Sequence, residues 1–415
     1  MRSPVPEYLA SVLRDCRQLD GGTVTEGNPE LASADPDTFA VALATVGGSL
    51  HGAGDTDVAF SIQSIAKAVA YALAIEDNGI ETVLEAVDVE PSGDSFNEIS
   101  LEATTGRPRN PLINAGALAV HSMIRGHGSE ERAGRMTDLL SRMAGRELSV
   151  DRAVYEAELE SDDRNTAIAH LLKSVGHLGA EPADVVDGYA RQCAVTVTCN
   201  DLARIAAVMA NGGKDPNTGE QVLDPAVDRH VLAVMATCGM YDGSGSWLAT
   251  VGIPAKSGVA GAIIGVLPGQ VGIAVVSPKL NEHGNSVRGV AVFERLSRDL
   301  GLHMMHVAPS GESAIRSMTE AEDVTTVELQ GDLRFAGAEA VTARLIGSVS
   351  EGNCTRVDFS EVRAIDGAAR RLLREALRVL ENEGHQVVVE DPDGFMTSPD
   401  RSEAAGENHV PVGQR

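Results

Sequence analysis

The sequence predicts an α/β protein, of the α+β kind, that is built from two domains. Three observations support this prediction. The chain has 415 residues, which is more than one ordinary domain needs. Residues 61–79 show helical periodicity, and residues 262–276 form two short apolar runs separated by Pro268-Gly269, which is the pattern of two adjacent strands. Residues 324–390 alternate between strand and helix patterns in the order β-α-β-α-β.

The first element that bears on function is the helix predicted at 61–79, SIQSIAKAVAYALAIEDNG. Its apolar residues fall on one face, its opening serines suit a helix cap, and Asn78-Gly79 is a typical stop signal. Ser64 then lies in the first turn, and Lys67 follows one turn later on the same side. Taken alone, this spacing is most often a solvated lysine near the start of a helix.

A second lysine stands at the head of the predicted strand pair, in PAKSGVAGAIIGVLPGQVGIAVV. An upstream SxxK followed by Lys-Ser-Gly on a strand is typical of the serine β-lactamase and penicillin-binding fold. There the serine is a nucleophile, a desolvated lysine of lowered pKa accepts its proton, and two backbone N–H groups bind the oxyanion. In this chain the pair is Ser64 and Lys67, and the two donors would be the N–H groups of Ser64 and Val259.

The last part of the chain has a different pattern. Strands are predicted at 324–329, 354–359 and 385–390, and helices at 336–350 and 368–383. A small, polar, proline-containing stretch precedes them, and a polar tail without periodicity follows. We therefore expect a first domain over 1–305, a linker over 306–322, a small domain over 323–392 and a disordered tail over 393–415.

Composition argues against several classes of function. A formal net charge of −26 repels nucleic acid and anionic membrane surfaces, so we expect neither as a partner. No apolar run reaches membrane-spanning length, and the N-terminus has no signal-peptide pattern, so we expect a cytoplasmic protein. The five cysteines lack CxxC spacing and predict free thiols. The eleven histidines are scattered, which predicts no metal site.

Seven ordered blocks of the sequence resemble the serine-dependent bacterial glutaminase family. They read FSIQSIAK, NPLINAGAL, VYEAELESDDRNTAIAHLL, DGYARQCAVTVTCNDLA, CGMYDGSG, PAKSGVAG and SPKLNEHGNSVRG. The resemblance covers roughly residues 5–300. It implies a serine β-lactamase-like sheet covered by helices, with a helical lobe across the active-site cleft. It also implies hydrolysis of L-glutamine to L-glutamate and ammonia by a homo-oligomer, a dimer or tetramer, without metal or organic cofactor.

The resemblance also implies roles for individual residues. Ser64 is the nucleophile, Lys67 its base, and Tyr241 the group that relays a proton. Glu158 is the only carboxylate of the set, so we assign it to the substrate ammonium by charge complementarity. Lys256 is expected to support the site electrostatically. The implied substrate-binding residues are Ser64, Asn114, Glu158, Asn165, Tyr189, Tyr241 and the backbone of Val259.

The sequence departs from the family pattern in one place that bears on the substrate. Gly27-Asn28-Pro29 stands where the family usually has a Tyr-Ile-Pro run. The family tyrosine often contributes to recognition near the mouth of the pocket, so we expect weaker affinity or a substitute group. Ala157 and Ala66 replace common serines, and neither change removes a role assigned above.

The C-terminal segment resembles the STAS domain of anti-sigma-factor antagonists. The resemblance lies in VELQGDLRFAGAEAV and VDFSEVRAIDGAARRLL. In the members that are phosphorylated, a serine follows the aspartate at the start of the second helix. Here Asp366 is followed by Gly367-Ala368-Ala369, so that switch should be absent. We expect a scaffold role instead, in self-association or in docking a protein partner.

Three functions remain open from the sequence. The first is a cytoplasmic glutaminase. The second is a β-lactamase or penicillin-binding-type acyl enzyme, against which the missing export signal counts. The third is a catalytically inactive regulator that works through its STAS domain. Each binding residue also has a structural interpretation: Asn114 and Asn165 as loop or cap residues, Tyr189 as a core residue, and Glu158 as a solvated charge.

Overall fold

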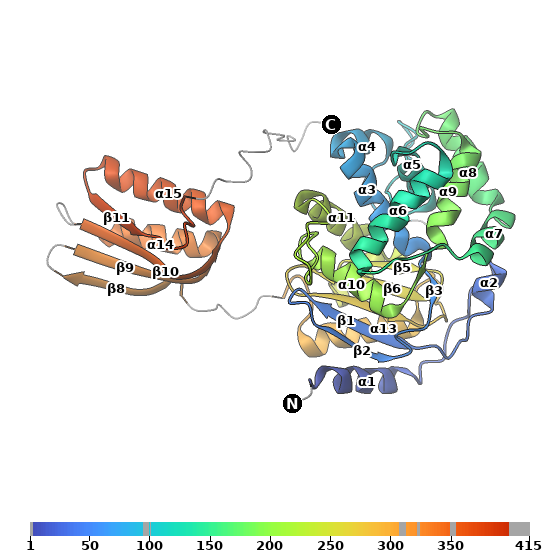
Figure 1. Cartoon of the computed structure of the whole chain (residues 1–415), viewed down its shortest axis with the longest axis horizontal. Helices are drawn as coiled ribbons and strands as arrows, with labels where there is room; N and C mark the ends of the chain where they lie inside the picture. The colour runs from blue at the N-terminus through green and yellow to red at the C-terminus, as the bar shows by residue number, and fades with distance from the viewer. Residues whose placement is uncertain are drawn as a thin grey trace. The chain divides into compact units, whose positions relative to one another are not determined.

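The chain forms two compact units, Met1–His306 and Val307–Arg415, each with helices and a sheet (Figure 1). This confirms the predicted α/β class. The computed structural model describes residues 3–93, 99, 101–306, 313–321, 324–348 and 354–397.

An antiparallel five-stranded sheet in the order β2-β1-β7-β6-β5 forms the centre of the first unit. Its strands are β1 (Ala40–Thr45), β2 (Leu50–Gly54), β5 (Ala255–Gly258), β6 (Ala262–Leu267) and β7 (Val271–Val276). Strands β3 (Phe60–Ser61) and β4 (Thr196–Val197) form a separate pair. Strands β6 and β7 meet at the predicted Pro268-Gly269 turn, and every residue of both strands is buried. Burial on both faces explains why their sequences are continuous apolar runs rather than alternating ones.

The two faces of this sheet are packed differently. Ile273 and its neighbours face α1 (Val5–Cys16) and α13 (Val287–Leu300), which lie together on one side of the sheet (Figure 1). The opposite face is rich in alanine and packs on α10 (Cys199–Ala210). A Cβ atom on Gly272 would lie 2.3 Å from the backbone nitrogen of Ala207. The helix therefore approaches the sheet closely only because this position is glycine.

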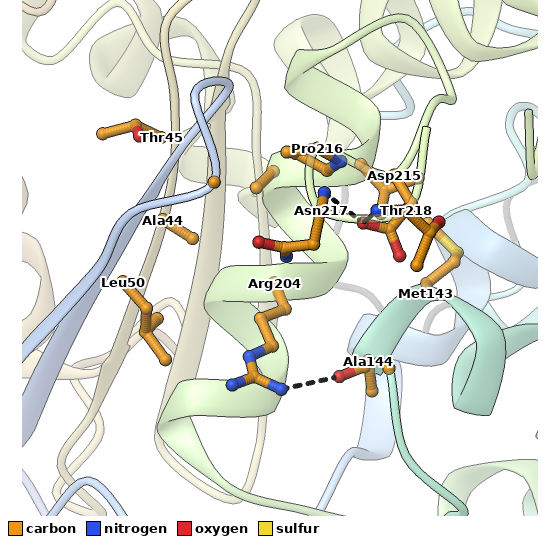
Figure 2. Close-up of a pocket in the computed structure, with 14 residues that line it drawn as sticks. Ala44, Thr45, Leu50, Met143, Ala144, Arg204, Asp215, Pro216, Asn217 and Thr218 are labelled. Atoms are coloured by element: carbon orange, nitrogen blue, oxygen red, sulfur yellow. Dashed lines mark hydrogen bonds between the residues drawn. The ribbon is translucent and has the colours of Figure 1, made fainter. Parts of the chain in front are cut away.

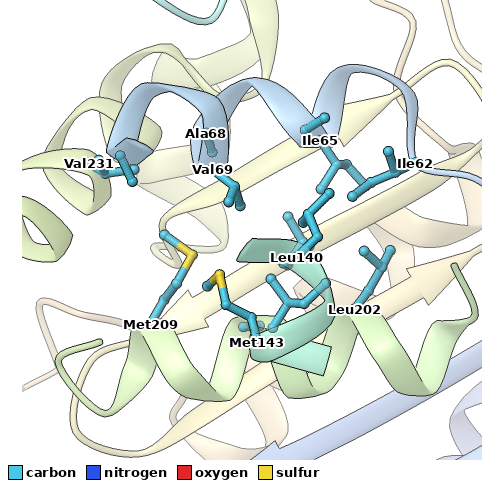
Figure 3. Close-up of a cluster of buried hydrophobic side chains, with 14 of the residues drawn as sticks. Ile62, Ile65, Ala68, Val69, Leu140, Met143, Leu202, Met209 and Val231 are labelled. Carbon is cyan, nitrogen blue, oxygen red and sulfur yellow. The ribbon is translucent and has the colours of Figure 1, made fainter. Parts of the chain in front are cut away.

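Helices α3 (Ala66–Asn78) and α6 (Gly128–Ala144) pack over α10 and form the main core. Figure 3 shows Ile65 and Val69 on the side that faces α6 and α10, and both belong to the same buried cluster as Leu140 of α6 and Leu202 of α10. A fully buried side chain of this kind contributes about 1.5–3 kcal/mol to stability. Helix α3 ends at Asn78, at the predicted stop signal. Its apolar contact with α6 and α10 therefore fixes its position in the core.

The remaining helices of the first unit include the helical lobe, in which α5, α8 and α9 enclose a separate apolar core. Two short 3₁₀ turns, η1 and η2, precede α3 and α12. The bounds are α2 (Pro29–Ala32), α4 (Ile80–Ala86), α5 (Asn114–Met123), α7 (Arg152–Glu160), α8 (Asp163–Ser174), α9 (Pro182–Cys193), α11 (Pro225–Cys238), α12 (Ser244–Thr250), η1 (Gln63–Ile65) and η2 (Tyr241–Gly243).

The second unit contains a four-stranded sheet in the order β11-β10-β9-β8. Its elements are β8 (Ile315–Ala321), β9 (Val324–Leu333), α14 (Phe335–Ser348), β10 (Cys354–Ile365), α15 (Gly367–Asn382) and β11 (Gln386–Glu390). Strands β9, β10 and β11 are parallel, and with the two helices they form the predicted β-α-β-α-β order. Strand β8 is a correction, because residues 315–321 were expected to be linker and instead pair antiparallel with β9. The other linker residues, 307–312 and 322, lie outside the described residues.

The predicted tail also needs a correction at its beginning. The backbone N–H groups of Phe395 and Met396 donate to the carboxylate of Asp391, and Arg374 donates to the carbonyl of Met396. Both Phe395 and Met396 pack against the core of the second unit. Residues 393–397 are therefore part of the folded unit, and residues 398–415 lie outside the described part of the chain.

A buried acid on α11 is expected to lower stability at alkaline pH. Asp228 is 2% exposed, its Oδ1 has no hydrogen-bond partner among the described residues, and burial raises its pKa from 3.8 to about 8. Above about pH 4 the unfolded chain ionises this group while the folded state keeps it neutral, so stability falls as the pH rises toward 8. We expect Asp228→Asn to raise the Tm by several degrees near pH 8 and much less near pH 4, as measured by calorimetry. Asp138→Asn, at an exposed position of α6, is the control. Equal shifts at both pH values would contradict this account.

Candidate active site

Ser64 lies in the 3₁₀ turn η1, which connects strand β3 to helix α3. The sequence predicted a first α-helical turn capped by serine. Instead, Ile62 and Ile65 occupy the cap positions, and neither cap has a side-chain hydrogen bond. Gln63 has a φ of 50°, in the left-handed region, which costs a non-glycine residue about 1–3 kcal/mol. Ser64 is 6% exposed and follows this strained residue directly.

Lys67 follows one turn after Ser64 and is completely buried. Its Nζ donates a hydrogen bond of 2.6 Å to Oδ1 of Asn114. Loss of hydration lowers the pKa of the Lys67 ammonium from 10.5 to about 8. A lysine with this pKa has a substantial neutral fraction near neutral to mildly alkaline pH, and only the neutral amine accepts a proton.

Tyr241 reaches the same place from η2, and it is the second non-glycine residue with a left-handed backbone, at a φ of 58°. Its hydroxyl donates to the carbonyl of Ser257 at 3.0 Å and is also hydrogen-bonded to the side chain of Ser64. Burial raises the pKa of Tyr241, so the phenol stays protonated.

Lys256 lies in strand β5 and is also completely buried. Its Nζ donates to the carbonyl of Ser257 at 2.6 Å and lies 4.1 Å from the centre of the Tyr241 ring. Burial and, after it, the positive charge of Lys67 hold the pKa of Lys256 well below its usual range. The charge of Lys67 therefore favours the neutral form of Lys256.

The end of strand β5 lies against the turn that carries Ser64. A Cβ atom on Gly258 would lie 3.3 Å from the carbonyl oxygen of Ile62 and 3.6 Å from Cβ of Gln63. Glycine thus permits the close approach. Val259, the next residue, lines a cavity together with Ser61 of β3.

Two asparagines extend the hydrogen-bonded chain away from Lys67. Asn114, the first residue of α5, accepts from Lys67 and donates through Nδ2 to Oδ1 of Asn165 at 3.0 Å. Asn165 lies in the first turn of α8, which begins directly after Asp162. Burial and the charge of Glu158 raise the pKa of Asp162 from 3.8 to about 7.

Glu158, on α7, is held by two side-chain amides. Its Oε1 accepts from Nδ2 of Asn28 at 3.0 Å and from Nε2 of Gln63 at 3.1 Å. Tyr189 of α9 is 6% exposed, and its ring centre lies 6.0 Å from Nζ of Lys67. These contacts link Lys67 to Asn114, Asn165 and Tyr189, and they link Glu158 to Gln63, the residue before Ser64.

Two cavities of the first unit differ in their relation to these residues. A cavity of about 320 Å³ has Ser61 of β3, Val259 and Leu31 of α2 in its lining. A second cavity, of about 240 Å³, lies between the β1–β2 turn, the end of α6 and helix α10 (Figure 2). Arg204 and Asn217 line it, but no predicted site residue does. Of the predicted site residues, Val259 alone lines the first cavity, so this residue is the link between that cavity and the site.

The described residues show no group of three His, Cys, Asp or Glu side chains that could hold a metal ion. They also include no helix that is long and apolar enough to cross a membrane. All five cysteines are free, and four of them are buried.

Comparison with known proteins identifies both units. A family profile described as Glutaminase matches residues 22–305. A glutaminase of Corynebacterium glutamicum is 46% identical over 395 residues, which are 95% of each protein. The chain belongs to the glutaminase family.

Solved structures agree with this assignment. A crystal structure of Mglu superposes on the glutaminase with a TM-score of 0.88 at 47% identity and covers 95% of this chain and 99% of that one. A probable glutaminase, ybaS, has a TM-score of 0.71 at 36% identity and covers 72% of this chain and 98% of its own. A glutaminase of Clavibacter michiganensis is 49% identical over 295 residues, 71% of this chain and 90% of that protein.

The second unit of the glutaminase matches a profile described as "Mlab, STAS domain" over residues 317–399. This confirms the predicted STAS resemblance. The match begins inside the segment that was expected to be linker, in agreement with strand β8. Asp366 caps α15 by accepting from the N–H of Ala369 at 2.7 Å.

Two residues at the glutaminase site escaped the sequence analysis, namely Asn28 and Gln63. Asn28 was noted only as a departure from the family pattern, and Gln63 was not assigned any role. Their partner Glu158 is 130 and 95 residues away in the sequence, so no local spacing could reveal the contact. The one available signal was the unusual Gly27-Asn28-Pro29 in place of the family run.

Proposed function

We propose that the protein hydrolyses L-glutamine to L-glutamate and ammonia through an acyl-enzyme on Ser64. The observation that carries this proposal is the buried Lys67 one turn from Ser64, with its pKa lowered to about 8 and its Nζ bound to Asn114. Nucleophilic catalysis by serine requires a nearby group that accepts its proton at working pH. Family membership supports glutamine as the substrate.

In the proposed reaction, the Ser64 oxygen attacks the side-chain amide carbon of glutamine while its proton passes to Lys67. The hydrogen bond between Ser64 and Tyr241 supports a route in which the phenol relays this proton. The amide oxygen becomes negative and is bound by the N–H groups of Ser64 and Val259. The proton is then delivered to the amide nitrogen, and ammonia leaves. Water hydrolyses the γ-glutamyl ester and regenerates Ser64.

The substrate is proposed to be recognised by its two charged groups. Glu158 pairs with the α-ammonium, because it is the carboxylate on the site side of α7. Asn114 and Asn165 donate to the α-carboxylate or the side-chain amide without adding charge. Tyr189 closes the pocket beside Lys67. Lys256 is assigned a supporting role, because its Nζ fixes the carbonyl of Ser257, to which the Tyr241 hydroxyl also donates.

The test of the proposal is ammonia release by the full-length protein. L-Glutamine, L-asparagine and a chromogenic β-lactam are compared at equal concentration. Release of ammonia from glutamine alone supports the glutaminase. β-Lactam hydrolysis would support the second function that shares the SxxK and KSG motifs. No turnover of any of the three would favour an inactive protein that acts through its STAS domain.

Replacing Glu158 by glutamine is expected to raise the KM for glutamine about tenfold or more, with a smaller change in kcat. The substitution keeps the shape of the side chain and removes the charge that pairs with the ammonium. The measurement is steady-state ammonia release. Glu156→Gln, at an exposed position of the same helix that pairs with Arg152, is the control. An unchanged KM would remove Glu158 from the substrate pocket.

We further propose that the enzyme works in the cytoplasm as a homo-oligomer. Four buried free cysteines support a reducing compartment.

The second unit exposes Phe335 and Ile346 on α14, at 61% and 58%, which supports association through this unit with another copy or with a protein partner. Light scattering of the full chain and of a variant with serine at both positions tests the second point.

A further inference from the structure

Among the described residues, the hydrogen bonds that Glu158 accepts reach one of its two carboxylate oxygens. Both recorded hydrogen bonds, from Asn28 and from Gln63, reach Oε1. Their donors are deeply buried, with Asn28 3% and Gln63 4% exposed, while Glu158 is partly exposed. The donors are neutral amides, so they orient the carboxylate and leave its negative charge intact. A carboxylate has further acceptor positions on its second oxygen, and these remain for a cation.

We propose that Asn28 is a positioning residue, which by holding Oε1 of Glu158 turns Oε2 toward the α-ammonium of the substrate. This inference rests on the proposed function, in which Glu158 receives that ammonium. Asn28 itself does not touch the substrate. It is thus the substitute group for the tyrosine that is missing from the segment 27–29.

The amide of Asn28 is fixed in the orientation that this role needs. Its Oδ1 accepts from the N–H of Glu30 at 2.9 Å and so caps helix α2, which begins at Pro29. With Oδ1 engaged, Nδ2 is the atom that faces Glu158. The opposite orientation would lose the cap and bring two oxygens together, so the assignment of the amide follows from its partners. Helix α2 packs against α7, the helix that carries Glu158.

Gln63 connects the same carboxylate to the nucleophile. Its Nε2 donates to Glu158 and also to Oγ of Ser61, at 3.2 Å, and its strained backbone precedes Ser64 directly. Without Asn28, only Gln63 would restrain a Glu side chain that has several rotatable bonds. The carboxylate would then sample orientations in which neither oxygen faces the ammonium, and part of the binding energy would be lost as ordering entropy.

A purely structural role for Asn28 makes a different prediction, and the two roles use different atoms. The cap of α2 uses Oδ1, and the bond to Glu158 uses Nδ2. Asn28→Ser keeps an oxygen that caps helices well but cannot reach Glu158. Ser33→Ala is the matched control, because it removes the 2.7 Å bond from Ser33 to the carbonyl of Glu30 after the same short helix and leaves Glu158 untouched.

The decisive comparison uses two substrates in the full-length enzyme. L-Glutamine carries the α-ammonium, and glutaric acid monoamide has the same carboxylate and amide without it. We expect Asn28→Ser to lower kcat/KM for glutamine about tenfold, mainly through KM, and to leave kcat/KM for the monoamide within twofold of the wild type. Ser33→Ala should match the wild type with both substrates. Equal losses with the two substrates, or no loss with glutamine, would overturn the proposal.

A second variant provides an independent readout through pH. Asn28→Asp keeps the cap but places a carboxyl group opposite Oε1. At low pH the two carboxyl groups share a proton and the bond persists, whereas at high pH they repel each other. The other titratable groups that face Glu158 are Asp162, Tyr189 and Cys193. They are common to both proteins, so the ratio of the variant KM to the wild-type KM is measured, and it should rise from pH 5 to pH 8.

A ratio that does not change with pH would contradict the role of Asn28. Failure of the wild type to release ammonia from glutamine would instead refute the proposed function. The wild-type activity is therefore measured before any variant is compared.

Discussion

Ser64→Ala should abolish ammonia release from L-glutamine, with a loss in kcat of roughly a thousandfold or more. The alanine variant has no oxygen to form the acyl-enzyme, and only the substrate-binding groups remain. The measurement is single-turnover ammonia release, together with intact-mass analysis of the quenched enzyme. The wild type should show a γ-glutamyl adduct and the variant none.

The variant must be shown to fold before this loss is interpreted. Ser64 lies in a turn whose stability comes from buried neighbours such as Ile62 and Ile65, so its substitution should leave the Tm nearly unchanged. Ser174→Ala, at an exposed position of α8, is the control for the chemical change. Glutamine turnover that persists in a folded Ser64→Ala protein would assign the nucleophile to another residue.

Lys67→Met should lower kcat about a hundred- to ten-thousandfold, which is the range for loss of a general base. Methionine fills a similar volume without a proton acceptor. In the wild type, Lys67 is charged below its pKa of about 8 and neutral above it, so kcat/KM should rise with pH, reach half its limit near pH 8 and then level off. Lys67→Arg should be equally inactive, because a guanidinium does not lose its proton in this range.

Lys173→Met tests whether loss of any lysine has this effect, because Lys173 is exposed and pairs with Glu181 on the surface of the helical lobe. It should retain the wild-type rate and pH profile. A wild-type kcat/KM that is constant from pH 6 to pH 9 would show that a group other than Lys67 accepts the serine proton.

Much of the fold follows from local patterns in the sequence. The β6–β7 hairpin was predicted because its two apolar runs flank Pro268-Gly269, and helix α3 because its periodicity ends at Asn78-Gly79. In the second unit the strand and helix patterns follow one another with clear stops such as Gly384, whose φ is 93°. These signals are local, so each can be interpreted without knowledge of the tertiary structure.

The missed features depend on partners that are distant in the sequence. Strand β8 is mostly polar and lies at the edge of its sheet, so its sequence looks like linker until its pairing with β9 is known. The 3₁₀ turn at Ser64 follows a residue that is fixed by a distant part of the chain. The N–H of Ile62 donates to the carbonyl of Val195 at 2.8 Å. Such a constraint comes from the assembled fold and has no local signature.

The site residues were predictable to the extent that the family resemblance carried them. It named Glu158 but could not supply Asn28, because this chain differs from the family at that position. Without the resemblance, an asparagine before a proline reads only as a helix cap, which it also is. The second function of its amide becomes visible only when α2 and α7 are placed side by side.

Strand β5 ends the sheet, yet its outer edge is occupied. The N–H of Ser257 donates to the carbonyl of Gly239 at 3.3 Å, and the carbonyl of Ser257 accepts from both Tyr241 and Lys256. A Cβ atom on Gly239 would lie 1.7 Å from the carbonyl oxygen of Ala255, so the two chains are in close contact. An extended polypeptide therefore cannot dock here by strand addition.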